Sequence, residues 1–155
     1  MTIQQQAKNK NMQAINNKQL TSDLIYMEMT VAWSKKSHCV SKQVGALIVK
    51  DSTIISDGYN GTPTGYDNCC EHYYLENTYG TKWEVIHAET NAILKCAKNG
   101  ISCNGATLYV TLSPCRDCSK LILQAGIIRV VYKENYKDAS GIEFLINNGV
   151  AVNKL

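Results

Sequence analysis

The chain has 155 residues, of which 45% are hydrophobic and 19% are charged, and its formal net charge is +3. These values are typical of one ordinary globular domain and exclude a disordered chain. No apolar run approaches the length needed to cross a bilayer, and the mild positive charge lacks the clustered basic face of a nucleic-acid binder. The polar N-terminus has no apolar segment typical of a secretory signal. We therefore expect a cytoplasmic protein that binds neither membrane nor nucleic acid.

The first predicted elements are a helix and a β-hairpin. Residues 1–19 are rich in Gln, Asn and Lys, so we expect a flexible polar tail or the start of the first helix, ahead of a single domain over residues 20–155. The apolar spacing of the next segment predicts a helix over residues 21–36. Two strand-like segments around a Lys-Asp-Ser turn predict a hairpin over residues 44–49 and 53–58.

The remainder of the chain alternates between strands and helices. A Gly/Pro loop covers residues 61–70, and residues 71–85 carry no regular pattern. Helices are predicted over residues 88–98, 115–125 and 139–149, and strands over 106–112, 127–132 and 150–155. This alternation predicts an α/β layer fold with partly parallel strands.

Seven cysteines are a high count for a chain of this length: Cys39, Cys69, Cys70, Cys96, Cys103, Cys115 and Cys118. An odd number without a secretory signal argues against a disulfide framework. Metal ligation or reduced thiols fit the composition better.

Two short motifs, each at the start of a predicted helix, together predict a catalytic zinc site. Cys115 and Cys118 have the Cys-x-x-Cys spacing of a zinc clip, and His87 would supply a third protein ligand. Three protein ligands leave a fourth tetrahedral position for water, which is the arrangement of a catalytic zinc. Glu89 follows His87 by two residues, so we expect it to lean over the same site and transfer protons. A redox pair at Cys115 and Cys118 is the alternative, but no thioredoxin-like pattern accompanies it.

The residues of these motifs resemble a known family. "HAETNAIL" (87–94) and "TLSPCRDC" (111–118) are similar to the zinc-binding core of the cytidine deaminase superfamily, whose signature is H-x-E followed by P-C-x-x-C. "VGALIVKDSTIISDGYNGTPTG" (44–65) and "NCC" (68–70) narrow the resemblance to its deoxycytidylate deaminase branch, particularly the bacteriophage type. The resemblance covers nearly the whole chain. It implies a cytidine deaminase-like three-layer α/β/α fold with a five-stranded mixed sheet.

The resemblance also implies a reaction and the residues that perform it. The reaction would be hydrolysis of dCMP to dUMP and ammonia, which supplies dUMP for thymidylate synthesis. Zinc bound by His87, Cys115 and Cys118 would activate water for attack on C4 of cytosine. Glu89 would give a proton to N3 and later help the amino group to leave. The resemblance implies three substrate contacts: Asn60, Ala88 and Ser113. Tyr132, at the end of a predicted strand, is a further candidate, and it fits a packed core aromatic equally well.

Two further sites are implied by the same resemblance. A second, structural zinc would use Cys39 and Cys69, completed by Cys70 or His72, with His38 as another option; buried free thiols are the alternative. Many members of the branch are hexamers that are activated by dCTP and inhibited by dTTP, with magnesium on the triphosphate. The loop "GYNGTPTG" (58–65) resembles the effector-site segment, and its glycines suit close approach of backbone to phosphates. The resemblance thus implies an effector site that includes Gly58, Tyr59, Gly61, Thr62, Pro63 and Gly65. A turn-rich connection without a ligand is the alternative.

Other functions fit parts of the sequence. Free-nucleoside deaminases usually present cysteine where this chain has His87. A tRNA adenosine deaminase shares both zinc motifs but should carry a basic face for phosphates. A single-strand DNA cytosine deaminase would need aromatic platforms and more positive charge. A non-catalytic zinc module would have no use for Glu89. These comparisons favour a nucleotide deaminase.

Overall fold

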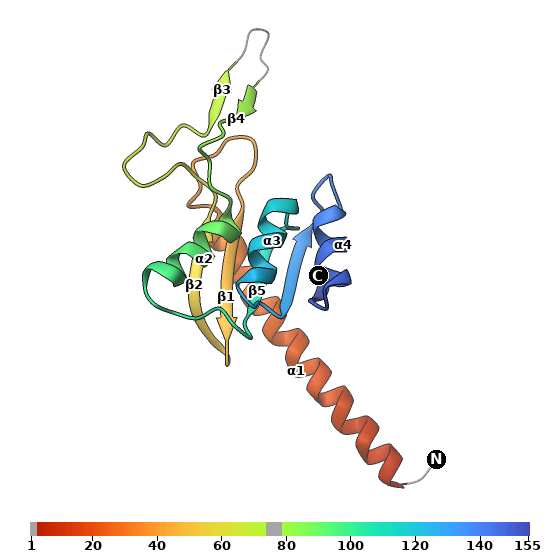
Figure 1. Ribbon diagram of the computed structural model, residues 1–155. Helices are drawn as coiled ribbons and strands as arrows, with labels where there is room; N and C mark the ends of the chain where they lie inside the picture. The colour runs from red at the N-terminus through yellow and green to blue at the C-terminus, as the bar shows by residue number, and fades with distance from the viewer. Residues whose placement is uncertain (1–2, 74–78) are drawn as a thin grey trace.

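A five-stranded mixed sheet forms the centre of the computed structural model, which describes residues 3–73 and 79–155 (Figure 1). Strand β1 pairs antiparallel with β2 on one side and with β5 on the other, whereas β5, β6 and β7 run parallel. The predicted mixed sheet is therefore confirmed. In order across the sheet, the strands are β2 (Thr53–Tyr59), β1 (Gly45–Lys50), β5 (Thr107–Leu112), β6 (Arg129–Glu134) and β7 (Ala151–Lys154).

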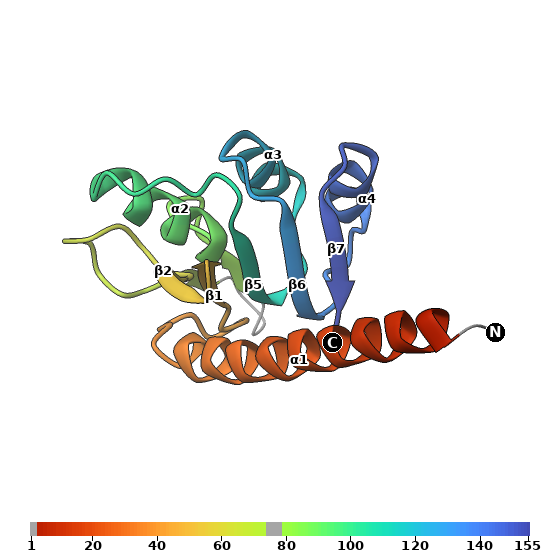
Figure 2. The same ribbon diagram turned by 90° about the horizontal axis from the view of Figure 1, so that it is seen from below.

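Helices cover both faces of the sheet, as Figure 2 shows. Helix α1 (Ile3–Ser34) lies across one face, and the other three helices lie on the opposite face. Parallel neighbours need a long crossover, and helices between β5, β6 and β7 supply it. The result is the expected three-layer α/β/α architecture. Within the described ranges, no helix is both long and apolar enough to cross a membrane. The three helices are α2 (Ala88–Lys98), α3 (Arg116–Gln124) and α4 (Ser140–Asn147).

Alternating side chains of the strands divide the core into two clusters. Along β1, Ala46 and Ile48 are buried in the cluster beneath α2, α3 and α4. Leu47 and Val49 point to the opposite face and pack with Met27 of α1. Successive side chains of a strand point to opposite faces, so a strand buried on both sides is apolar without interruption. This explains the continuous apolar run of β1 and its central position.

Most predicted elements are present, and their ends lie within two residues of the predicted ends. Two segments differ. Helix α1 begins at Ile3, long before the predicted start at residue 21, and its first half extends beyond the sheet (Figure 1). Residues 71–85 were expected to be irregular, but they contain the antiparallel strands β3 (Glu71–Tyr73) and β4 (Tyr79–Thr81).

Candidate active site

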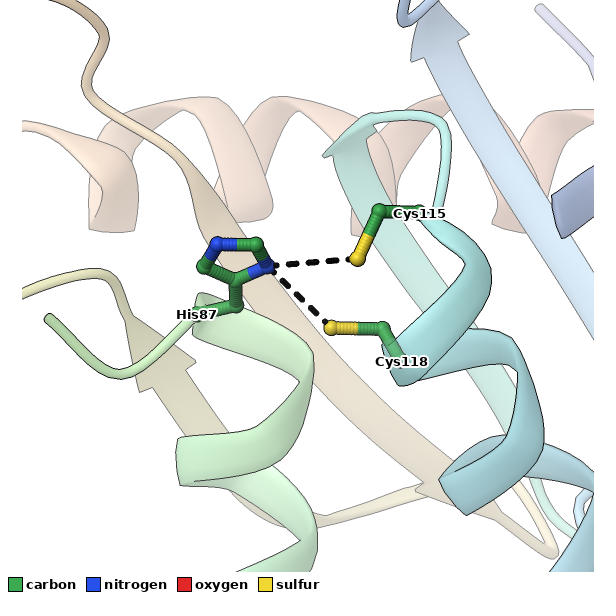
Figure 3. Close-up of side chains that lie close together, drawn as sticks. All are labelled: His87, Cys115 and Cys118. Carbon is green, nitrogen blue, oxygen red and sulfur yellow. Dashed lines mark hydrogen bonds between the residues drawn. The ribbon is translucent and has the colours of Figure 1, made fainter. Parts of the chain in front are cut away.

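His87, Cys115 and Cys118 converge where two neighbouring helices begin (Figure 3). His87 immediately precedes α2, Cys115 immediately precedes α3, and Cys118 lies in the first turn of α3. The Nδ1 atom of His87 lies 3.5 Å from Cys115 Sγ and 3.4 Å from Cys118 Sγ. The structure therefore brings together all three predicted metal ligands and identifies Nδ1 as the ligating nitrogen.

The spacing of these atoms fits a shared zinc ion. Zinc bonds nitrogen at about 2.0–2.1 Å and sulfur at about 2.3 Å, so a tetrahedral angle separates the two ligand atoms by about 3.5 Å. The observed separations of 3.4 and 3.5 Å agree with this value. Across the described part of the chain, these three residues are the one group of His, Cys, Asp and Glu with such spacing, and Glu89 is not a member. The set thus supplies three protein ligands, as a catalytic zinc requires.

The two thiols differ in acidity before a metal binds. Hydrogen bonds with Cys118 and then His87 lower the pKa of the Cys115 thiol to about 4. The bond to Cys115 in turn raises the pKa of His87. The pKa of Cys118 is raised by its bond with Cys115 and by burial. A bound cation stabilises both thiolates, so metal loading would remove the second proton.

Glu89 occupies a buried position beside the metal ligands. It is the second residue of α2, and only 4% of its surface is exposed. Burial raises the pKa of its carboxyl to about 7, close to the value at which one group both accepts and donates protons near neutral pH. A Cβ atom at Gly58 would collide with the backbone of Ala88 and Ala92. The glycine thus lets α2 pack directly on β2, which sets the position of Glu89.

A cavity of about 260 Å³ opens beside these residues. Three of the predicted substrate contacts, Asn60, Ala88 and Ser113, line it together with His87, Glu89 and Cys115. The Asn60 side chain is fixed, because Oδ1 accepts from the Val44 amide and Nδ2 donates to the Lys42 carbonyl, both at 2.8 Å.

Tyr132, the fourth predicted substrate contact, is not part of the cavity lining. Its side chain is partly buried and packs against the core cluster. Residue 132 lies within β6, and a substrate contact there stays a prediction. The alternative expectation, a core aromatic, matches the structure.

Sequence patterns missed several residues of the cavity lining. They come from loops and strand ends that approach the site only in the folded chain. For one of them, Tyr136, the sequence held a weak signal, since this residue shortly follows a predicted strand. In the structure its amide donates to Ser113 Oγ at 2.7 Å. The additional lining residues are Ser41, Lys42, Val44, Thr81, Val85, Leu112 and Tyr136.

The proposed second zinc site is not formed. Cys39 and Cys70 are joined by a disulfide, so neither has a thiolate to offer a metal. Cys69 instead directs its thiol to the Glu71 carbonyl at 3.4 Å, and His72 is exposed. The cysteines were expected to ligate metal or to stay reduced, and this bond between residues 31 positions apart corrects that expectation for Cys39 and Cys70. It ties the segment before β1 to the start of β3.

We expect five titratable thiols and about one zinc ion per chain. The thiols are those of Cys69, Cys96, Cys103, Cys115 and Cys118. Thiol titration of the denatured, metal-free chain should give five groups before reduction and seven afterwards, and metal analysis of the native protein gives the zinc content. Seven thiols without reduction, together with two zinc ions, would contradict the disulfide.

The predicted effector residues lie around two adjoining depressions rather than one. Gly58, Tyr59, Gly61, Thr62 and Pro63 line a groove of about 570 Å³, whose other wall includes Asn91, Lys95, Lys98 and Asn99 of α2 and its C-cap. Gly65 lines a neighbouring depression of about 370 Å³. The two lysines supply positive charge that the loop itself lacks.

The fold and the metal ligands are those of a zinc-dependent deaminase. A family model described as "Cytidine and deoxycytidylate deaminase zinc-binding region" matches residues 20–134, and the chain belongs to this family. The match includes all three metal ligands and Glu89.

Several of the similar proteins are deoxycytidylate deaminases. That of Enterobacteria phage T4 is 40% identical over an alignment of 154 positions, gaps included, and the match covers 74% of this chain and 79% of the phage protein. The crystal structure of dCMP deaminase from cyanophage S-TIM5, in complex with dCMP and dUMP, has a TM-score of 0.78 and 42% identity; the match covers 84% of this chain and 94% of that one. A structure from work on tRNA:A34 deaminases has a TM-score of 0.58 at 24% identity, so it shares the fold.

Proposed function

We propose that this protein deaminates dCMP hydrolytically to dUMP and ammonia in the cytoplasm. The observation that carries the proposal is the single cavity in which the metal ligands, the buried Glu89 carboxyl and the fixed Asn60 side chain meet. The T4 protein and the cyanophage structure, both named for this activity, support the choice of substrate.

The residues of the cavity have separate roles in this reaction. His87, Cys115 and Cys118 would hold the zinc, which when bound would make a water acidic enough to attack near neutral pH. Glu89 accepts a proton from the attacking water, holds it away from solvent and donates it to N3 of the pyrimidine. The same carboxylate then takes the proton of the hydroxyl now bonded to C4 and delivers it to the amino group, which leaves as ammonia while the C4 carbonyl forms, so Glu89 acts in turn as base and acid. Asn60 is held by two hydrogen bonds and orients the nucleotide beside it.

Ammonia release tests the proposal. The zinc-loaded protein is assayed with dCMP, dCTP, deoxycytidine and a tRNA anticodon stem-loop. The highest kcat/KM is expected for dCMP. Turnover of the stem-loop adenosine without turnover of dCMP would assign the protein to the tRNA branch. Stoichiometric zinc without turnover of any substrate would indicate a non-catalytic zinc module.

We also propose that the groove beside α2 binds the triphosphates dCTP and dTTP, with magnesium. Lys98 can neutralise phosphate charge. Lys95 can do so when a phosphate replaces Asp57, which lines the same groove and lies 2.6 Å from Lys95 Nζ. Gly61 and Ile86 exchange two backbone hydrogen bonds of 3.1 and 2.9 Å across this groove, and Ile86 immediately precedes the metal ligand His87. An occupant could therefore shift His87 through one peptide unit. A homo-oligomer, which we propose to be a hexamer, is supported by exposed apolar side chains on α1: Leu20, Leu24, Ile25 and Met29.

Lys98→Met is expected to reduce the response to effectors while leaving dCMP turnover in their absence unchanged. Lys98 lines the effector groove and does not line the catalytic cavity. Saturation curves for dCMP, measured with and without dCTP or dTTP, give the response. Lys154→Met, an exposed lysine on β7, is the matched control. Hyperbolic wild-type kinetics that neither triphosphate alters would refute the effector site.

A further inference from the structure

The catalytic cavity is lined by several polar side chains that have no assigned role in the reaction at C4. Besides Ser113, three side chains with hydroxyl groups and one lysine line it: Ser41, Thr81, Tyr136 and Lys42. Lys42 is the one lysine or arginine among the described residues that form the lining. A pyrimidine and a deoxyribose offer no negative charge for an ammonium group, whereas a 5′-phosphate does.

Lys42 is paired with a carboxylate that lies outside the cavity lining. Its Nζ atom is 2.6 Å from Glu134 Oε2, and the two side chains are 51% and 52% exposed. Exposed ion pairs of this kind contribute little to stability. A phosphate dianion carries more charge than one carboxylate and accepts several charge-assisted hydrogen bonds. It can therefore displace Glu134 from Lys42 at low cost.

The loop that carries Lys42 is held in place from two sides. Glu71 of β3 is 3% exposed, and its Oε1 atom accepts from the Val40 amide at 2.9 Å and from the Ser41 amide and hydroxyl at 3.1 Å. Asn60 Nδ2 donates to the carbonyl of Lys42 itself at 2.8 Å. The position of Lys42 is thus fixed by the same asparagine that lines the cavity, and a preorganised loop loses less entropy when it binds a ligand.

We propose that Lys42, assisted by the neighbouring hydroxyl groups, binds the 5′-phosphate and makes the enzyme select a nucleotide over a nucleoside. Glu134 occupies Lys42 when the phosphate is absent. Glu71 is a positioning residue for the loop. This assignment rests on the proposed deamination of dCMP and adds to it the residue that distinguishes dCMP from deoxycytidine.

Substitution of Lys42 should affect the two substrates differently. Lys42→Met is expected to lower kcat/KM for dCMP by about 10- to 100-fold, the range for loss of a hydrogen bond to a charged group, and to leave kcat/KM for deoxycytidine unchanged. Lys42→Arg should restore part of the loss, because it retains the charge. Glu134→Gln removes the competitor and should lower KM for dCMP. Lys133→Met is the control, since this exposed lysine neighbours Glu134 but does not line the cavity.

Binding of the product separates this inference from the proposed reaction. Calorimetry with dUMP and deoxyuridine measures the preference for phosphate without turnover. Wild type should prefer dUMP, and Lys42→Met should lose that preference. Equal losses for nucleotide and nucleoside, or no loss for either, would overturn the role of Lys42 even if wild type deaminates dCMP. A protein that fails to deaminate dCMP but shows Lys42-dependent binding of dUMP would refute the reaction and retain the phosphate site.

Discussion

Glu89→Gln is expected to lower kcat for dCMP by about 10²- to 10⁴-fold, the usual contribution of a positioned general acid–base group. Glutamine keeps the shape of the side chain but neither accepts the proton nor returns it. Glu89 is buried beside the cavity, and solvent has little access to replace it. The loss should therefore appear in kcat, because Glu89 transfers protons during the chemical step and does not hold the bound nucleotide.

The variant must retain its metal for this result to identify a proton carrier. Zinc content and the circular dichroism spectrum should match wild type, since Glu89 is not one of the three clustered ligands. Glu143→Gln is the matched control: this glutamate also lies in the first turn of a helix, but it is exposed and distant from the cavity lining. Turnover within a few-fold of wild type would refute the assignment. Loss of zinc together with activity would make Glu89 a ligand instead.

The metal site was predictable because its information is local. Cys115 and Cys118 are separated by one helical turn, and His87 and Glu89 by two residues, so each pair is confined to one element before the chain folds. Helix N-termini favour thiolates and carboxylates, so the sequence indicated metal ligation by the cysteines and proton transfer by Glu89. The one long-range step, the meeting of α2 with α3, was inferred from the complementary ligands of the two motifs, and the resemblance supported it.

Other features of the structure depend on contacts between residues far apart in sequence, and the spacing of motifs does not reveal such contacts. Lys42 enters the cavity because Glu71 and Asn60 hold its loop, and those residues are distant in sequence. The Cys39–Cys70 disulfide likewise joins residues 31 positions apart. The early start of α1 had a different cause. Its first residues include the good helix formers Gln, Ala and Lys, but their sequence lacks apolar periodicity. Propensity would have found this segment where periodicity did not.

Asp23→Ala is expected to reduce the free energy of unfolding by about 3–5 kcal/mol, the range for removal of one partner from a buried ion pair. Asp23 is 3% exposed and connects α1 to the sheet. Its two oxygens accept from Arg129 at 2.9 and 2.6 Å, and Oδ1 also accepts from the Tyr109 hydroxyl at 2.6 Å. Alanine would leave a guanidinium that is 21% exposed, and a buried phenol, without these bonds.

Urea denaturation measures this loss. Glu28→Ala is the control, because Glu28 lies on the same helix, is exposed and should change stability by less than about 0.5 kcal/mol. Equal midpoints for Asp23→Ala and wild type would show that α1 is held by apolar packing alone. A loss confined to the control would contradict the assigned pairing in the same experiment.

The stability difference between wild type and Asp23→Ala should also depend on pH. Burial alone would raise the pKa of Asp23, but hydrogen bonds from Arg129, Tyr109 and Gln19 outweigh it and hold the pKa below its ordinary value of 3.8. A carboxyl whose folded pKa is depressed stabilises the protein above its unfolded pKa, and this contribution is lost as pH falls through the folded value. The difference should therefore be constant near neutral pH and begin to narrow below about pH 5. A difference that widens in acid would mean that Asp23 is protonated in the native protein, and the pairing with Arg129 would have to be abandoned.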